Sequence, residues 1–233
     1  MDKQVIITIG REYGSGGHVI AQDIAKRFNV PYYNRNLIEE VAKQNNFDTD
    51  NIKDYDESPR KYLFSRTVQG YSNSPEEILA GLQFDFIKEK AASGESFVIV
   101  GRCADYVLKD MDCVASFFIV ADNEAKLQRT METKQLSQRD AEATIKRHDR
   151  NRKTYYKDHT DMEWGNSKNY DMTINSTVLG FKKTADIIED FVKTKLTEGY
   201  LKFVGKYMHR WLQDNPQEDE NGKPMEMGAA SQG

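Results

Sequence analysis

A glycine-rich stretch near the start of the chain has the residue types that bind phosphate. In ITIGREYGSGGHVIA, residues 7 to 21, an apolar run is followed by Gly14, Ser15, Gly16 and Gly17, and helical spacing begins near His18. Glycines permit unusual dihedral angles and close approach, so several backbone N–H groups can converge on one anion, and a helix N-terminus adds a partial positive charge. We therefore expect these five residues to bind phosphate.

The stretch lacks the lysine that phosphate-binding loops normally carry. The pattern G-x-x-x-x-G-K-[ST] is matched only in part, because Gly17 and His18 stand where the lysine and the hydroxyl residue belong. Arg11 lies in the same loop, and its permanent, forked charge suits phosphate oxygens at least as well as a lysine does. We expect Arg11 to supply the missing charge in catalysis. The alternatives are a loop that holds a nucleotide without transferring phosphate, and a turn that only connects a strand to a helix.

A dinucleotide-binding loop fits the same stretch no better. The pattern G-x-G-x-x-G, counted from Gly14 and Gly16, would need glycine or alanine at Val19. No clear acidic residue follows a strand about twenty positions further on, where such proteins bind ribose. A dinucleotide-dependent oxidoreductase is therefore the least favoured interpretation.

A basic segment later in the chain is typical of a lid over phosphates. KRHDRNRKTYYKDH, residues 146 to 159, has five basic residues between positions 146 and 153 against one acidic residue. Ser137 followed by Asp140 indicates a helix start, so the segment is expected to be helical. On that helix Arg147 and Arg150 share a face. We expect this pair to clamp donor phosphates; a solvated, charged face is the alternative.

Strand and helix patterns alternate along the chain. Apolar runs at 4 to 9, 97 to 101 and 114 to 120, with a last short strand at 171 to 176, are typical of strands covered on both faces by helices. Helices are expected after the glycine loop, from Asn36, from Ser74 and Pro75 to the SGES sequence, and after the last strand. This order predicts an α/β fold with a parallel sheet. Residues 46 to 73 have no clear pattern, 201 to 213 is predicted to be an amphipathic helix, and 214 to 233 a disordered tail.

Composition limits the class of protein. The chain has 233 residues, 38% of them hydrophobic, and a net charge of -4, so we expect one globular domain and no nucleic-acid partner. No apolar run is long enough for a signal peptide or a membrane span, so a cytoplasmic protein without a membrane partner is expected. Cys103 and Cys113 have no His/Cys cluster beside them and are interpreted as reduced thiols.

Four stretches together resemble the cytidylate kinase-like family of bacterial P-loop proteins. They are the glycine-rich loop with its helix, LQFDFIKEKAASGESFVIVGRCADYVL, FFIVADNEAKLQRTME and YDMTINST, and the resemblance covers about residues 4 to 193. It implies a three-layer α/β/α P-loop kinase fold over residues 1 to 200. A helical acceptor-binding lobe is implied at about 34 to 95 and an arginine-rich lid at about 134 to 168. The family uses a G-S-G-G loop, so the missing lysine is a family trait.

The chain departs from the family pattern at two positions. Gly10 stands where serine is common, and Asn34 where aspartate is common, which removes a carboxylate there.

The resemblance also implies an acceptor site. Arg102, after the run FVIVG, is similar to the arginine of the GRD sequence in cytidylate kinases, which contacts the acceptor monophosphate. Arg35 resembles the arginine that follows the early tyrosine in those enzymes. Asp105 is expected to accept a hydrogen bond from a base amine or to hold a Mg²⁺-bound water. The alternatives are an ion pair at a strand end for Arg102, a surface salt bridge for Arg35 and helix capping for Asp105.

These observations lead to two hypotheses about function. The first is ATP- and Mg²⁺-dependent transfer of the γ-phosphoryl group to a nucleoside monophosphate, CMP or dCMP first, or to a similar small acceptor. The second is a nucleotide-binding regulatory protein without turnover, suggested by the missing lysine, the missing hydroxyl and Asn34. The sequence assigns no residue to the magnesium ion.

Overall fold

The computed structural model describes residues 3–34, 37, 67–68, 71–72 and 75–197. The chain divides into two units, Met1–Asp190 and Phe191–Gly233. The sheet, the loop at residues 12–16 and the helix that carries the basic segment all belong to the first unit; the loop is called the phosphate loop after its predicted role. Arg35, the helix expected from Asn36, the helix at 201–213, the tail at 214–233 and most of the expected acceptor lobe lie outside the described residues.

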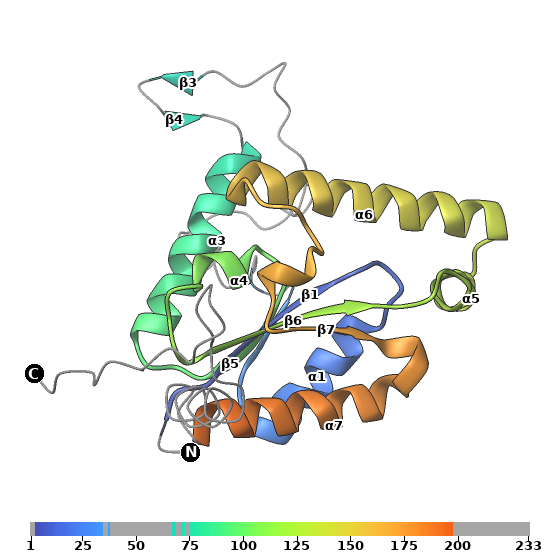
Figure 1. Cartoon of the computed structure of the whole chain (residues 1–233). Coiled ribbons are helices and arrows are strands. Elements are labelled where there is room, and N and C mark those ends of the chain that lie inside the picture. Colours follow the sequence, from blue (N-terminus) through green and yellow to red (C-terminus); the bar gives the residue numbers. More distant parts are fainter. Residues whose placement is uncertain (1–2, 35–36, 38–66, 69–70, 73–74, 198–233) are drawn as a thin grey trace, which may run out of the picture. The chain divides into compact units, whose positions relative to one another are not determined.

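A five-stranded parallel sheet lies at the centre of the first unit (Figure 1). In spatial order its strands are β2 (Tyr32–Tyr33), β5 (Phe97–Val100), β1 (Ile6–Arg11), β6 (Val114–Val120) and β7 (Met172–Asn175). Pairing aligns Ile9 of β1 with Val100 of β5, and Arg11 of β1 with Ile119 of β6. The central strands are buried almost throughout, which is why their sequences are continuously apolar. The predicted α/β fold with a parallel sheet is confirmed.

Helices alternate with the strands as the sequence predicts, although the helices at 104–107 and 123–134 were not among those expected. They are α1 (Gly17–Phe28), α3 (Pro75–Ala92), α4 (Ala104–Val107), α5 (Asn123–Lys134), α6 (Gln138–Thr160), the 3₁₀ turn η4 (Ser167–Asn169) and α7 (Ser176–Thr197). A small antiparallel pair, β3 (Thr67–Val68) and β4 (Tyr71–Ser72), lies in the stretch without a clear sequence pattern. Across these described ranges, no helix combines the length and apolar character that a membrane span needs.

Side chains of the central strands join the helices into a core. Phe97 and Ile99 of β5 pack in one buried cluster with Phe86 and Ile87 of α3 and with Leu108, just after α4. Figure 1 shows α3 and α4 on one side of the sheet and α1 on the other. The sheet therefore lies between two helical layers.

The basic segment forms a single long helix, α6, which starts where the sequence predicts. Ser137 is its N-cap, and the Oγ of Ser137 accepts a hydrogen bond from the backbone N–H of Asp140 at 3.3 Å. Tyr155 and Tyr156 near the end of α6 are buried in a cluster with Ala80 and Cys103. This burial fixes which face of α6 is turned toward the sheet.

Candidate active site

Polar residues follow β1 and β5 at the carboxyl edge of the sheet. Arg11 is the last residue of β1, and Gly101 and Arg102 come directly after β5. β5 and β2 lie on one side of β1, and β6 and β7 on the other. In open parallel sheets, ligands bind outside the carboxyl ends of the strands where the strand order reverses. The phosphate loop and the predicted acceptor arginine meet at this position.

The loop between β1 and α1 has a backbone suited to anions. Gly14 and Gly16 have φ angles of 77° and 80°, which favour glycine. Gly16 is the N-cap of α1, and no side chain caps the helix. The Val19 N–H donates to the Gly16 carbonyl oxygen at 2.9 Å, which leaves the N–H groups of Gly17 and His18 at the start of the helix for a ligand. The hydroxyl of Ser15 donates to the carbonyl oxygen of Glu12 at 2.9 Å and tightens the loop.

The side chain of Arg11 fills the space that a lysine at position 17 would need. A Cβ atom built on Gly17 would lie 2.6 Å from the Cβ of Arg11 and 3.2 Å from its Cγ. Cβ contacts this short do not occur in close-packed proteins, so a side chain at position 17 and the arginine at position 11 exclude each other. Arg11 is buried, with 9% of its surface exposed.

Helix α5 holds the loop from one side. Lys126 forms an ion pair with Glu12 at 2.9 Å, and the Ala121 N–H donates to the same carboxylate oxygen at 3.3 Å. The guanidinium of Arg129 donates to the carbonyl oxygen of Gly14. Because the Lys126 side chain is only 8% exposed, its attraction to Glu12 is weakly screened by water.

Helix α6 holds the loop from another side. The backbone N–H of Tyr13 donates to Oδ1 of Asp149 at 2.7 Å, and Nη1 of Arg152 donates to the carbonyl oxygen of Arg11 at 3.3 Å. The ring of Tyr13 stacks on His148 with centroids 4.5 Å apart. Burial raises the pKa of Asp149, partly opposed by the Tyr13 N–H. The phosphate loop is thus fixed by contacts from two helices distant in sequence.

A small cavity lies where β1, β5 and α6 meet. Its lining consists of glycines, cations, aromatic rings, a thiol and a carboxylate: Gly10, Arg11, Gly101, Arg102, Cys103, Asp105, Arg152, Tyr155, Tyr156, Trp164 and Tyr170. Its volume is about 20 Å³, room for about one water molecule. A larger ligand can therefore bind here only if some of the lining residues move.

Arg102 has an unusual backbone for an arginine. It is the largest fully buried side chain of the described residues, with 1% of its surface exposed. Gly101, Arg102 and Cys103 have φ angles of 79°, 61° and 51°, three successive left-handed residues that turn the chain from β5 into α4. Left-handed geometry is unfavourable for residues with a Cβ atom.

Asp105 is bound by residues of the lid segment. The Tyr156 hydroxyl donates to Oδ2 of Asp105 at 2.7 Å, and Tyr170 lines the same cavity. Burial raises the pKa of Asp105 to about 6, and the hydrogen bond from Tyr156 partly opposes this. Burial also raises the pKa of both tyrosines.

The structure brings some predicted residues together and leaves others apart. Arg11, Arg102 and Asp105 line one cavity, whereas Arg147 and Arg150 are exposed on α6. The arginine of α6 that lines the cavity is Arg152, which the sequence reasoning did not select. The sequence does contain a pattern that indicates Arg152: it lies one turn before Tyr155 and Tyr156 and therefore on the same helix face as this aromatic pair.

His18 lies at the start of α1 and is exposed. Although the residue as a whole is exposed, partial desolvation of its ring lowers its pKa, and the charges of Arg11 and Arg152 lower it further, which favours the neutral imidazole.

Carboxylates beside the loop could hold a magnesium ion only together with other ligands. In the described part of the chain, no three His, Cys, Asp or Glu side chains are grouped closely enough to hold a metal by themselves. Magnesium usually takes one or two carboxylates together with waters and substrate phosphates. Glu12 in the loop and Asp149 on α6 are carboxylates of this kind beside the loop. The donor set therefore fits a magnesium ion that arrives with a nucleotide.

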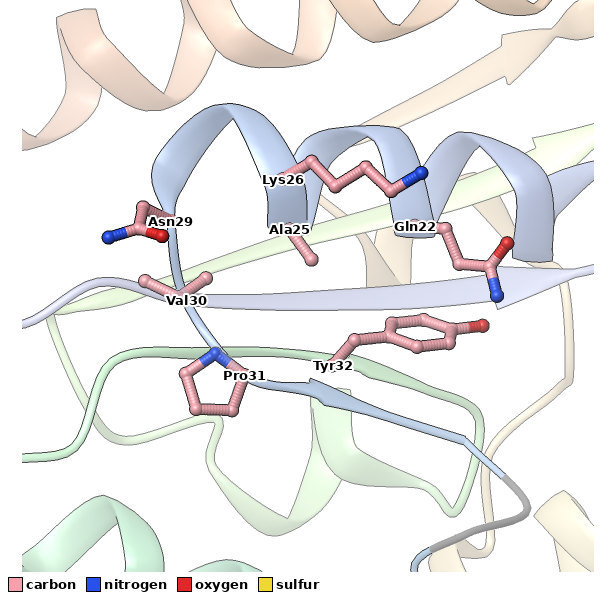
Figure 2. Close-up of a pocket in the computed structure, with 7 residues that line it drawn as sticks. All are labelled: Gln22, Ala25, Lys26, Asn29, Val30, Pro31 and Tyr32. Carbon is pink, nitrogen blue, oxygen red and sulfur yellow. The ribbon is translucent and has the colours of Figure 1, made fainter.

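A second hollow lies away from the arginines. It has a volume of about 560 Å³ between the end of α1 and β2, and Figure 2 shows its lining residues, Gln22, Ala25, Lys26, Asn29, Val30, Pro31 and Tyr32. Lys26 is the only charged residue among them. Its size is greater than that of the arginine-lined cavity, but its residue types offer little chemistry.

Comparison with known proteins gives a family. Residues 6–178 match the cytidylate kinase-like family. A solved structure of an uncharacterized protein from Eubacterium ventriosum is 33% identical, with a TM-score of 0.66, over 82% of this chain and 99% of that one. No curated protein matches the chain.

Two shikimate kinase structures are more distant. The enzyme from Bacteroides thetaiotaomicron is 10% identical over 81% of this chain and 98% of its own, with a TM-score of 0.48. The enzyme from Aquifex aeolicus is 16% identical over 85% of this chain and 99% of its own, with a TM-score of 0.46. The chain belongs to the cytidylate kinase-like family, and its α/β fold is that of a P-loop kinase.

Proposed function

We propose that the protein transfers the γ-phosphoryl group of ATP to a nucleoside monophosphate or a similar small acceptor, with CMP or dCMP as the first candidates. The observation that carries this proposal is the meeting of Arg11, Arg102 and Arg152 in one cavity beside the uncapped N-terminus of α1. Phosphoryl transfer needs little covalent help from a protein; it needs positioning and positive charge around the moving group. Three buried or half-buried guanidinium groups supply that charge.

The donor phosphates are assigned to the loop. The N–H groups of residues 14–18 would bind phosphate oxygens, and Arg11 would supply the charge that the lysine provides in other loops. Arg147 and Arg150 remain proposed contacts to the donor from the outer part of the lid. Magnesium, when bound, neutralises charge between the donor phosphates, and Glu12 and Asp149 are the residues that would hold it.

The acceptor is assigned to the β5 side of the cavity. Arg102 and Arg35 would bind its phosphate, and Asp105 would accept a hydrogen bond from its base. In the transfer step the bond between the γ-phosphorus and the bridging oxygen of ADP breaks, and a bond to an acceptor phosphate oxygen forms. Arg152, which bonds to the carbonyl oxygen of Arg11 and lines the same cavity as Arg102, is placed to stabilise charge between donor and acceptor.

A regulatory protein that binds nucleotide without turnover is the second candidate. It is favoured by the absence of any side chain at Gly17 and by a cavity of only about 20 Å³. Both candidates predict nucleotide binding, but only the first predicts ADP formation that depends on an acceptor.

The test is ADP formation from Mg-ATP with CMP, dCMP, UMP, AMP or GMP, and without acceptor. Arg11→Ala and Arg102→Ala are each expected to lower acceptor-dependent turnover about 10²- to 10³-fold. Arg139→Ala is the matched control, because Arg139 is an exposed arginine on α6 and its loss should change the rate less than twofold. Nucleotide binding without acceptor-dependent ADP would favour the regulatory protein.

A transplanted charge tests the role of Arg11 directly. Arg11→Gly removes the side chain that blocks position 17, and Gly17→Lys then restores the lysine of the standard loop. The double variant should bind Mg-ATP better than Arg11→Gly alone, whereas Gly17→Lys alone should lose binding because lysine and arginine collide. Equal ATP affinity in Arg11→Gly and the double variant would show that the site at position 17 does not face the phosphates.

A further inference from the structure

Helix α6 contacts both sides of the candidate site on one face. Asp149 accepts a hydrogen bond from the Tyr13 N–H at 2.7 Å, and Tyr156 donates to Asp105 at 2.7 Å. Positions 149 and 156 are seven residues apart, which is two helical turns, so the two side chains leave α6 on the same face. α6 is one continuous helix from Gln138 to Thr160. One uninterrupted helical segment therefore joins the two contacts.

We propose that Asp149 and Tyr156 are positioning residues that couple the phosphate loop to the acceptor side of the cavity through α6. While Tyr156 is bonded to Asp105, Asp149 holds the loop at the Tyr13 N–H. When Tyr156 leaves Asp105, α6 shifts and its contacts with the loop loosen as well. The use of this coupling in catalysis rests on the proposed function, but the contacts belong to the protein without ligand.

The size of the cavity explains why the contact must open. About 20 Å³ cannot contain an acceptor, and Tyr156 and Tyr170 are among the residues that enclose it. An entering acceptor molecule would displace the Tyr156 hydroxyl. The N–H or O–H groups of that molecule would then donate hydrogen bonds to Asp105 in its place. Through α6, this exchange alters the phosphate loop, so occupancy of one side changes affinity at the other. Such coupling is reciprocal by thermodynamic necessity.

Protonation of Asp105 gives the coupling a direction with pH. The groups around Asp105 are the guanidinium groups of Arg11, Arg102 and Arg152, which line the same cavity, the Cys103 thiol, and the hydroxyls of Tyr155, Tyr156 and Tyr170. In the closed arrangement, in which Tyr156 donates to Asp105, burial raises the pKa of Asp105. Once that contact opens and water reaches the carboxylate, Asp105 regains an ordinary pKa. The closed arrangement therefore binds a proton more tightly, and lowering the pH from 7.5 to 5.5 favours closure.

The Tyr13 amide is a direct reporter of the coupling, because its N–H bonds to Asp149. Its hydrogen exchange can be followed by NMR in the full-length protein without ligand. Tyr156→Phe keeps the ring and removes the hydroxyl that donates to Asp105. Exchange of the Tyr13 amide should then become about tenfold faster, the loss expected for one hydrogen bond to a charged group. Tyr155→Phe is the matched control on the neighbouring residue and should change Tyr13 exchange less than twofold.

Two outcomes would overturn the inference. If Tyr156→Phe speeds exchange only at residues 104–107 and leaves Tyr13 unchanged, the two sides of the site are not coupled. If the two tyrosine variants speed Tyr13 exchange equally, the effect is general loosening of α6. Far-UV circular dichroism of both variants checks that α6 is retained.

The pH arm uses Asp105→Asn, which keeps the shape of the side chain and removes its titration. After correction for intrinsic exchange, protection of the Tyr13 amide should rise in the wild type as the pH falls from 7.5 to 5.5, and should stay constant in the variant. Parallel pH profiles would overturn the role of Asp105. All of these measurements are made without nucleotide, so a negative kinase assay leaves this test intact, and a kinase without coupling overturns only this inference.

Discussion

Substitution of Gly17 by alanine tests whether Arg11 occupies the space of the missing lysine. The new Cβ would lie 2.6 Å from the Cβ of Arg11, and relief of such a collision by backbone or side-chain shifts costs about 1–3 kcal/mol. Alanine is a better helix former than glycine by up to about 1 kcal/mol, which offsets part of this cost. Gly17→Ala should therefore lower the free energy of unfolding by about 1–2 kcal/mol.

The sign of this effect should reverse when the arginine side chain is removed. Arg11→Gly is required for this, since alanine at position 11 would keep the colliding Cβ atom. In the Arg11→Gly background the new Cβ at position 17 meets no Cβ at position 11, so alanine contributes only its higher helix propensity. Gly17→Ala should then raise the free energy of unfolding by about 0.5–1 kcal/mol. The double-mutant cycle then gives a coupling energy of about 2 kcal/mol, because the separate cost of glycine in β1 cancels.

The assay is urea denaturation of the four proteins, with free energies compared where the slopes agree. Gly81→Ala in α3 is the control, because no atom lies within 4 Å of a Cβ built there. It should stabilise by about 1 kcal/mol in both backgrounds. A coupling energy between positions 11 and 17 below about 0.5 kcal/mol would refute the reasoning, since independent sites add to within that limit.

Three further predictions follow from other contacts. Gly10→Ser, which restores the residue common in the family, should destabilise by about 1–3 kcal/mol in urea denaturation, because a Cβ at Gly10 would lie 2.6 Å from the ring of Phe118; an unchanged midpoint would contradict this. Asp105→Asn should be most favoured over the wild type above pH 7. Burial raises the folded-state pKa of Asp105 to about 6, so the charged carboxylate destabilises the wild type above that pH. As the pH falls to 4, the free energy of unfolding of the wild type should rise by up to about 3 kcal/mol relative to the variant. Parallel stability curves for the two proteins would exclude this. Arg27→Ala should lower the free energy of unfolding by about 1–2 kcal/mol, because Arg27 bonds three carboxylates at 2.8–2.9 Å. Since salt screens ionic attraction, this loss should be smaller in 0.5 M salt.

The sequence predicted the parts of the fold that depend on local chemistry. The apolar runs became β1, β5 and β6 because strands covered on both faces need no polar side. The glycine loop and the Ser137 cap followed equally from local rules, since dihedral freedom and capping involve only a few neighbouring residues.

The parts that escaped prediction depend on contacts between distant residues. The rotation of α6 about its axis is set by burial of Tyr155 and Tyr156, and this rotation places Arg152 in the cavity while Arg147 and Arg150 face outward. Lys126 reaches Glu12 across 114 positions of sequence, and no periodicity encodes such a pair. The nature of the acceptor likewise depends on the shape of an opened cavity and stays a prediction.

The left-handed run from Gly101 to Cys103 makes the placement of Arg102 a property of the backbone. Left-handed geometry costs about 1–2 kcal/mol at each of the two non-glycine residues, and it persists only where the surroundings enforce it. Side-chain rotation alone cannot reproduce the position of the guanidinium from an ordinary backbone. Tolerance to mutation should therefore be lowest at the neighbours that sustain this bend. A β-branched residue at position 103 disfavours the left-handed backbone and should shift the Arg102 side chain, whereas glycine or asparagine at position 103 should keep it in place.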